Sequence, residues 1–242
     1  MLESAAGLLT PDEWSALHLS LKVSLWATAA SLPFGIAAAW LVARVRFPGR
    51  MLVDGLIHMP LILPPVVTGY LLLVTFGRRG PVGAFLAEHF GLVFSFRWTG
   101  AALACAVMGF PLMVRAIRLS LEAVDARLEE AASTLGAAPA AVFATVTLPL
   151  MAPGILTGMV LAFARSMGEF GATVTFVGNI PGETQTLPTA IYSFTQVPGG
   201  DAAALRLTLI SVAVSFAALM LSELLARRAR ARLGLGHGHG HG

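Results

Sequence analysis

EAASTLGAAPAAVFATVTLP, residues 130–149, is a short polar, helix-forming segment in a chain that is otherwise mostly apolar. Glu129 and Glu130 lie near the start of the predicted helix, where the helix dipole favours acidic side chains. The alanines that follow, and the small residues of 136–138, keep the helix surface flat. A flat helix can enter a groove on a partner, so we expect this segment to be recognised outside the membrane.

Composition predicts an integral membrane protein. Hydrophobic residues make up 56% of the 242 residues, charged residues 12%, and the mean hydropathy is +0.78. Charged residues are about a quarter of a typical soluble domain, which excludes an ordinary soluble protein. A hydrocarbon core about 30 Å thick requires about 20 apolar residues per helix. Five stretches are long enough, and they predict an all-α protein with about five transmembrane helices: 17–43, 52–76, 98–117, 146–167 and 205–226.

Basic residues predict the orientation, because short cytoplasmic loops accumulate Lys and Arg. Ten of them follow the first, third and fifth spans: Arg44, Arg46, Arg50, Arg115, Arg118, Arg127, Arg227, Arg228, Arg230 and Arg232. Five lie toward the opposite side: Lys22, Arg78, Arg79, Arg97 and Arg206. We therefore expect an external N-terminal segment (1–16), a transmembrane domain (17–226) whose segment of about 122–149 is cytoplasmic, and a basic, His/Gly-rich cytoplasmic tail (227–242).

No catalytic or metal site is predicted on this chain. A phosphate-binding loop needs a lysine after glycine, whereas the only lysine, Lys22, follows a leucine in an apolar span. Cys105 is the only cysteine, and no Cys/His pair has the spacing of metal ligands. The HGHGHG end, 237–242, is a low-complexity tail. Any ATP hydrolysis therefore belongs to another chain.

The polar segment carries a recognisable spacing. The pattern is EAA, then G after three residues, then a branched apolar residue after nine more, and LP after one more. In this sequence these positions are Glu130, Ala131, Ala132, Gly136, Val146, Leu148 and Pro149. This pattern resembles the EAA signature of permease subunits of binding-protein-dependent ABC importers. The resemblance implies that these residues form a cytoplasmic coupling helix that docks on a separate ATPase. An ordinary amphipathic helix between two spans is the alternative.

The second span is interrupted by Pro60, Pro64 and Pro65, each of which removes a backbone donor. We expect the helix to kink or open there. Freed carbonyls inside a bilayer are tolerated where they face protein or a water-filled cavity. Pro64 and Pro65 are therefore candidates for the translocation path or its gate, and a kink that only improves packing is the alternative.

The fourth span carries a charged pair. Arg165 and Glu169 are four residues apart and share a helix face, which lowers the cost of about 2.5–3.5 kcal/mol for a charge at mid-membrane. They are further candidates for the path or gate, and an ion pair that only fixes packing is the alternative. Gly154 and Gly158 form a GxxxG pair that predicts close helix approach.

Most of the chain, from about residue 13 to residue 226, looks like the molybdate permease subunit of bacterial ABC importers. The resemblance rests on SLKVSLWATAASLPFGIAAAWLVAR, RFPGR, MPLILPPVVTGYLLLV, GFPLMVRAIRLSLE and LAFARSMGEFGATVTFVGNIPGETQTLP. It implies a MetI-like ABC permease fold in the bacterial inner membrane. It also implies, as partners, a second copy of the chain, two ATPase subunits that bind ATP and Mg²⁺, a periplasmic molybdate-binding protein and membrane lipid. No cofactor on this chain and no nucleic acid are expected. Val146, where the signature has Ile, is a conservative departure.

Three other functions compete with this interpretation. Sulfate or thiosulfate permeases share GEFGA and the EAA segment, but GNIPGETQTLPTAIYS, residues 178–193, favours molybdate. A secondary anion transporter working alone would have no use for an EAA helix and would commonly show an internal repeat of spans, which this sequence does not. A membrane scaffold without an energy source fits the spans but leaves the coupling segment unexplained. A turn-rich external loop, a candidate contact for a binding protein, contains Gly178, Pro181, Gly182 and Pro188.

Overall fold

The computed structural model describes residues 9–232, and within that range all regular structure is helical. The ends of the chain, including the first half of the predicted external segment and the His/Gly-rich end of the tail, lie outside the described residues. Four helices are long and apolar enough to cross a membrane: Pro11–Arg44, Trp98–Glu122, Pro139–Met167 and Asp201–Leu221. They confirm the first, third, fourth and fifth predicted spans.

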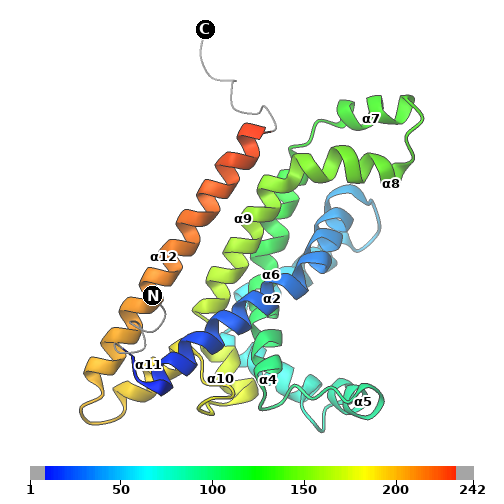
Figure 1. Ribbon diagram of the computed structural model, residues 1–242. Coiled ribbons are helices and arrows are strands. Elements are labelled where there is room, and N and C mark those ends of the chain that lie inside the picture. Colours follow the sequence, from blue (N-terminus) through cyan, green and yellow to red (C-terminus); the bar gives the residue numbers. More distant parts are fainter. Residues whose placement is uncertain (1–8, 233–242) are drawn as a thin grey trace.

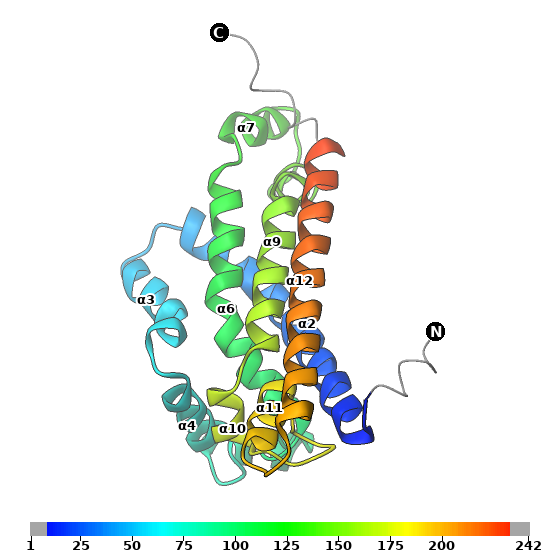
Figure 2. The same ribbon diagram turned by 90° about the vertical axis from the view of Figure 1, so that its left-hand side faces the viewer.

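The four long helices are α2 (Pro11–Arg44), α6 (Trp98–Glu122), α9 (Leu148–Met167) and α12 (Asp201–Arg232). Figure 1 and Figure 2 show α6, α9 and α12 running alongside one another, with α2 crossing them obliquely. The contact between α6 and α9 is very close, because a Cβ on Gly158 would lie 3.0 Å from the Met113 carbonyl oxygen and one on Gly154 would lie 2.1 Å from Ser120 Cβ. The close approach predicted from GxxxG is confirmed.

Helix α2 begins at Pro11, six residues before the predicted boundary at 17. Its first turn is closed by a capping box, in which the Glu13 N–H donates to Thr10 Oγ1 at 3.3 Å and the Thr10 N–H donates to Glu13 Oε2 at 2.8 Å. Glu13 is fully buried, and Arg206 of α12 donates to its Oε1 at 2.7 Å. The start of α2 is thereby joined to the start of α12.

The predicted second span is divided into two helices, α3 (Arg50–Ile62) and α4 (Pro65–Phe76), bent by 114°. Leu63 and Pro64 between them are extended, with ψ of 142° and 135°. A residue before proline is pushed out of the helical region, and Pro65 is then well placed in the first turn of α4. The predicted break is confirmed at this proline pair, whereas Pro60 lies inside α3.

Short helices lie at the two ends of the long ones (Figure 1). At one end are α7 (Ala126–Thr134) and α8 (Pro139–Val142), and a five-residue π-helix, Phe143–Thr147, joins α8 to α9. At the other end are α5 (Pro81–Phe90), α10 (Gly171–Val177) and α11 (Leu187–Thr195). The polar segment therefore lies at one end of the long helices, and the break between α3 and α4 lies at a different place in the structure.

Candidate coupling segment and translocation path

The candidate coupling segment contains a pair of short helices, α7 and α8, that reverse direction at a glycine. Asp125 starts α7 by accepting a hydrogen bond from the Arg127 N–H at 2.9 Å. At the other end, Gly136 has φ of 88°, and its N–H donates to the Ser133 carbonyl. The Ala137 N–H donates to the Ala132 carbonyl, which completes a Schellman cap. The glycine of the signature is therefore required by the backbone, in addition to keeping the surface flat.

The other signature residues fall into an exposed set and an anchoring set. Glu130 and Ala131 are exposed, and the Glu130 carboxylate makes no hydrogen bond or ion pair within residues 9–232. Val146 is half-buried in the π-helix, and Leu148 packs against the buried core between α6 and α9. Pro149 is exposed in the first turn of α9, where it needs no backbone donor. The exposed set is available to a partner, and the anchoring set holds the segment to the membrane domain.

Glu129, one residue before the signature, joins α7 to two other elements. Arg44, at the end of α2, lies 3.1 Å from its Oε2, and Thr147 of the π-helix donates to its Oε1 at 2.7 Å. Arg44 also donates to the Leu121 carbonyl at the end of α6 at 3.5 Å. Sequence reasoning gave Glu129 only a place near the helix dipole, because a contact across 85 residues leaves no local pattern.

An exposed leucine marks the tip of the coupling segment. Leu135, the residue between α7 and Gly136, is 89% exposed, and Leu128 of α7 is 49% exposed. The predicted cytoplasmic end therefore presents apolar side chains beside the free Glu130 carboxylate. Apolar side chains surrounded by polar groups are typical of protein contact sites.

The candidate path residues come together where α4 meets α10. A Cβ on Gly171 would lie 2.8 Å from Pro65 Cβ, and one on Gly69 would lie 2.6 Å from the Ala172 carbonyl oxygen. The α4 and α10 backbones are thus in close contact, and the exposed Pro64–Pro65 break contacts Gly171, which follows Glu169 by two residues in the sequence. The structure brings together candidates that are about a hundred residues apart in sequence.

Arg165 and Glu169 form the predicted ion pair, with Arg165 Nη1 2.6 Å from Glu169 Oε2. They do not share a helix face as predicted, because α9 ends at Met167 and Glu169 lies in the turn that follows. The Arg165 side chain is 26% exposed and that of Glu169 only 1%. Glu169 also accepts a hydrogen bond from the Ala172 N–H at 2.8 Å through Oε1. One carboxylate therefore both neutralises Arg165 and caps α10, which fixes the turn between α9 and α10. Its role in anion passage stays a prediction.

The basic residues segregate between the two ends as the sequence predicted. Arg44 reaches α7 through Glu129, and Arg118 near the end of α6 pairs with Asp54 at 3.1 Å and Glu122 at 2.8 Å. Arg78 and Arg97 instead flank α5 at the opposite end. Which end faces the cytoplasm stays a prediction.

This arrangement of helices is that of ABC transporter permeases. The chain aligns with a bacterial ABC transporter that imports the acidic polysaccharide alginate at a TM-score of 0.72 and 17% identity, covering 91% of this chain and 81% of that one. It aligns with the MetNI methionine ABC transporter at a TM-score of 0.68 and 15% identity, covering 95% and 99%. These likenesses show the fold, and the second supports the MetI-like form predicted from the resemblance.

The chain belongs to the family of inner membrane components of binding-protein-dependent transport systems, whose model matches residues 31–231. It is 61% identical over 220 residues to the molybdenum transport system permease protein ModB of Escherichia coli K12, covering 91% of this chain and 96% of the relative. It is 38% identical over 217 residues to the sulfate transport system permease protein CysW of the same strain, covering 88% and 74%.

Proposed function

We propose that this chain is the permease subunit of a bacterial ABC importer for molybdate. The observation that carries the proposal is the high identity to a molybdenum permease along nearly the whole length of both chains. The sulfate permease is much less similar over a comparable stretch and extends further beyond it. Molybdate and sulfate are both tetrahedral dianions, so this difference supports the choice between two chemically similar substrates.

The proposed energy source is ATP hydrolysed on a separate subunit that docks on the coupling segment. The exposed Leu135 and Glu130 offer a contact surface. Glu129 connects this surface to the membrane helices. A displacement of α7 by the ATPase would move Arg44 of α2 and Thr147 of the π-helix, since both are bonded to the same carboxylate. Motion at the ATPase would thereby reach two membrane helices.

The proposed assembly has two copies of this chain, two ATPase subunits and a periplasmic molybdate-binding protein, with the α7–α8 end in the cytoplasm and α5, α10 and α11 outside. A related fold supports the last partner, because the alginate importer has been solved with a periplasmic protein bound to an alginate pentasaccharide. The clustering of basic residues near α7 supports the orientation. In this assembly the chain supplies the pathway and the coupling, and the partner subunits supply the ATP hydrolysis.

Reconstitution tests this function. The chain, the ATPase and the binding protein are placed in liposomes, and uptake of molybdate and of sulfate is measured with and without ATP. We expect uptake that requires ATP and the binding protein and that prefers molybdate. A preference for sulfate would establish the alternative permease function. Molybdate uptake in the absence of the ATPase would establish a secondary transporter.

A further inference from the structure

A hollow of about 590 Å³ lies at the end of the molecule opposite the coupling segment. It is formed where the chain leaves α4 and where it enters α6, on either side of α5. Its lining residues are Leu73, Gly77, Arg78, Arg79, Val93, Ser95, Phe96 and Arg97. Three of these eight are arginines and none is acidic, so the hollow has a positive rim around an apolar interior.

The three arginines of the rim are free to bind a partner. Arg78, Arg79 and Arg97 are all exposed, and none forms an ion pair within residues 9–232. The loop that carries them is nevertheless fixed, because the Arg78 N–H donates to the buried Ser95 hydroxyl at 3.1 Å. Arginine at a protein surface matches the planar geometry of carboxylates.

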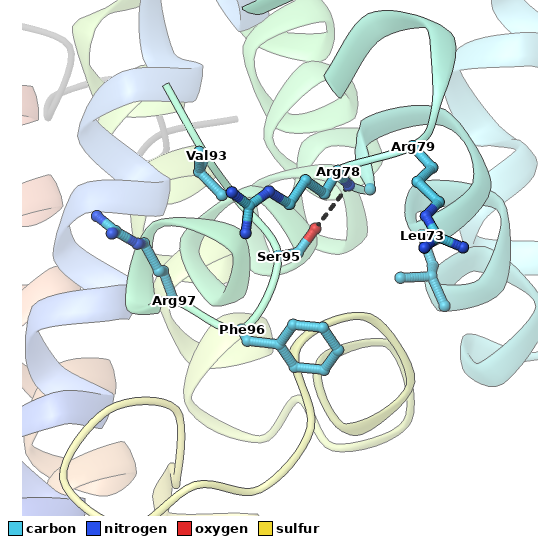
Figure 3. A pocket seen from close by; sticks show the side chains of 8 residues that line it. Leu73, Arg78, Arg79, Val93, Ser95, Phe96 and Arg97 are labelled. Atoms are coloured by element: carbon cyan, nitrogen blue, oxygen red, sulfur yellow. Dashed lines mark hydrogen bonds between the residues drawn. The ribbon is translucent and has the colours of Figure 1, made fainter. Parts of the chain in front are cut away.

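The arrangement of the guanidinium groups suits a protein surface better than one small anion. In Figure 3, Arg79 points away from Arg78, and Arg97 projects from the opposite side of the hollow. As they lie, the three groups do not converge on one point, whereas a single tetrahedral oxyanion would need them to do so. Several carboxylates spread over a partner would meet them separately.

Phe96 adds an apolar anchor to the same surface. Its side chain is 58% exposed. Its backbone has φ of 57°, a left-handed conformation that is costly for a bulky residue. The ring lies close to Gly178, since a Cβ there would be 3.8 Å from Phe96 Cδ1. Gly178 begins the turn-rich loop that the sequence suggested as a contact for a binding protein. Phenylalanine and arginine are both enriched in protein interfaces relative to the rest of the protein surface.

We propose that Arg78, Arg79, Arg97 and Phe96 form a docking surface for an acidic patch on the periplasmic substrate-delivering protein. This inference rests on the proposed function. The arginines attract and orient the partner over the mouth of the permease, and Phe96 fills an apolar site at the centre of the contact. The surface lies at the end of α4, and α4 packs along α10, so docking there places the partner on the two helices that carry the candidate path.

The test measures the affinity of the molybdate-loaded binding protein for the complete transporter in lipid nanodiscs. We expect Arg79→Glu with Arg97→Glu to weaken binding by about tenfold or more, mainly through slower association, because complementary charge acts on the encounter rate. Raising the salt concentration should weaken the parent more than this variant. Arg46→Glu is the matched control, because Arg46 is also exposed and unpaired but lies at the coupling end. Arg97→Lys, which keeps the charge, should stay within about threefold of the parent.

Three results would overturn the docking surface. Unchanged affinity in the double variant, with a parent that binds and transports, would reject it while leaving the proposed function intact. Unchanged affinity with impaired molybdate uptake would assign the arginines to the small anion itself. A loss of bound phosphatidylglycerol, with no change in affinity in nanodiscs of neutral lipid, would assign them to lipid headgroups. Failure of the parent to take up molybdate would instead reject the proposed function.

Discussion

Two arginine–glutamate pairs of different character mark the two ends of the molecule. Arg44 and Glu129 come from different helices and are both partly exposed, at 30% and 22%, whereas Arg165 and Glu169 share one turn and Glu169 is 1% exposed. A partly exposed pair between elements is weak enough to shift during a transport cycle. A pair with a buried carboxylate is costly to break. The first is suited to transmitting motion and the second to holding a fixed turn.

Breaking the buried pair should have the largest effect. Arg165→Met leaves the Glu169 carboxylate buried without its partner, which should cost about 3–5 kcal/mol and lower the amount of protein in the membrane. Glu169→Gln should cost less, because a glutamine oxygen can still accept the Ala172 N–H. Membrane levels and thermal unfolding of the two single variants and the double variant measure this. The double variant should recover part of the Arg165→Met loss, and parental levels in every variant would show that the pair contributes nothing to assembly.

A bulky residue at the coupling tip should have the next largest effect, on coupling and not on insertion. Gly136→Trp adds bulk where the ATPase is proposed to seat and also forces a non-glycine residue to φ of 88°. Gly136→Ala separates these effects, since it adds the strain, about 1–2 kcal/mol, with almost no bulk. We expect the tryptophan variant alone to lose most of the ATPase on copurification. Equal losses in both variants would assign the effect to the helix cap.

Weakening the partly exposed pair should have a smaller effect. Glu129→Gln removes the charge facing Arg44, and a double-mutant cycle with Arg44→Gln should give a coupling energy of about 0.2–1 kcal/mol. Molybdate taken up per ATP hydrolysed should fall modestly while ATPase copurification persists. Glu130→Gln is the comparison variant, because the Glu130 carboxylate makes no hydrogen bond or ion pair within residues 9–232. This variant should affect ATPase binding first. The opposite pattern would exchange the roles of the two glutamates.

Cysteine substitution should have the smallest effect of the series, and labelling of the cysteines tests which end is cytoplasmic. Glu183 and Ala138 are exposed at opposite ends of the molecule, and the native Cys105 is buried. We expect Glu183→Cys to react with an impermeant thiol reagent from outside and Ala138→Cys to react only after the cells are opened. Thr184 is unsuitable as a probe, because it is fully buried. External labelling at Ala138→Cys would reverse the orientation.

Local sequence patterns predicted the features that depend on nearby residues. Hydrophobic runs gave the long helices, the proline pair gave the break before α4, and the spacing of Arg165 and Glu169 gave their ion pair. The start of α2 at Pro11 differs from the predicted boundary at 17, because the capping box of Thr10 and Glu13 extends the helix ahead of the apolar run.

Features that join distant segments were not predictable in this way. Arg44 and Glu129 are 85 residues apart, and the hollow rimmed by Arg78 and Arg97 is closed only by the folding of the loops around α5. The left-handed backbone of Phe96 also has no sequence signal, because a phenylalanine rarely adopts it. Tertiary packing determines these contacts, and the hydrophobic periodicity of the sequence does not predict them.

If the α7–α8 end receives the ATPase while the opposite end handles the substrate, Leu135→Ser should impair the first function and spare the second. Leu135 is 89% exposed at the coupling tip, and Met51 of α3 is a matched control at 87%. We predict that Leu135→Ser loses ATP-driven molybdate uptake and ATPase copurification but still binds the loaded binding protein, whereas Met51→Ser behaves like the parent. Normal uptake and copurification in Leu135→Ser, or loss of binding-protein affinity instead, would contradict the assignment of ATPase binding to one end and substrate handling to the other.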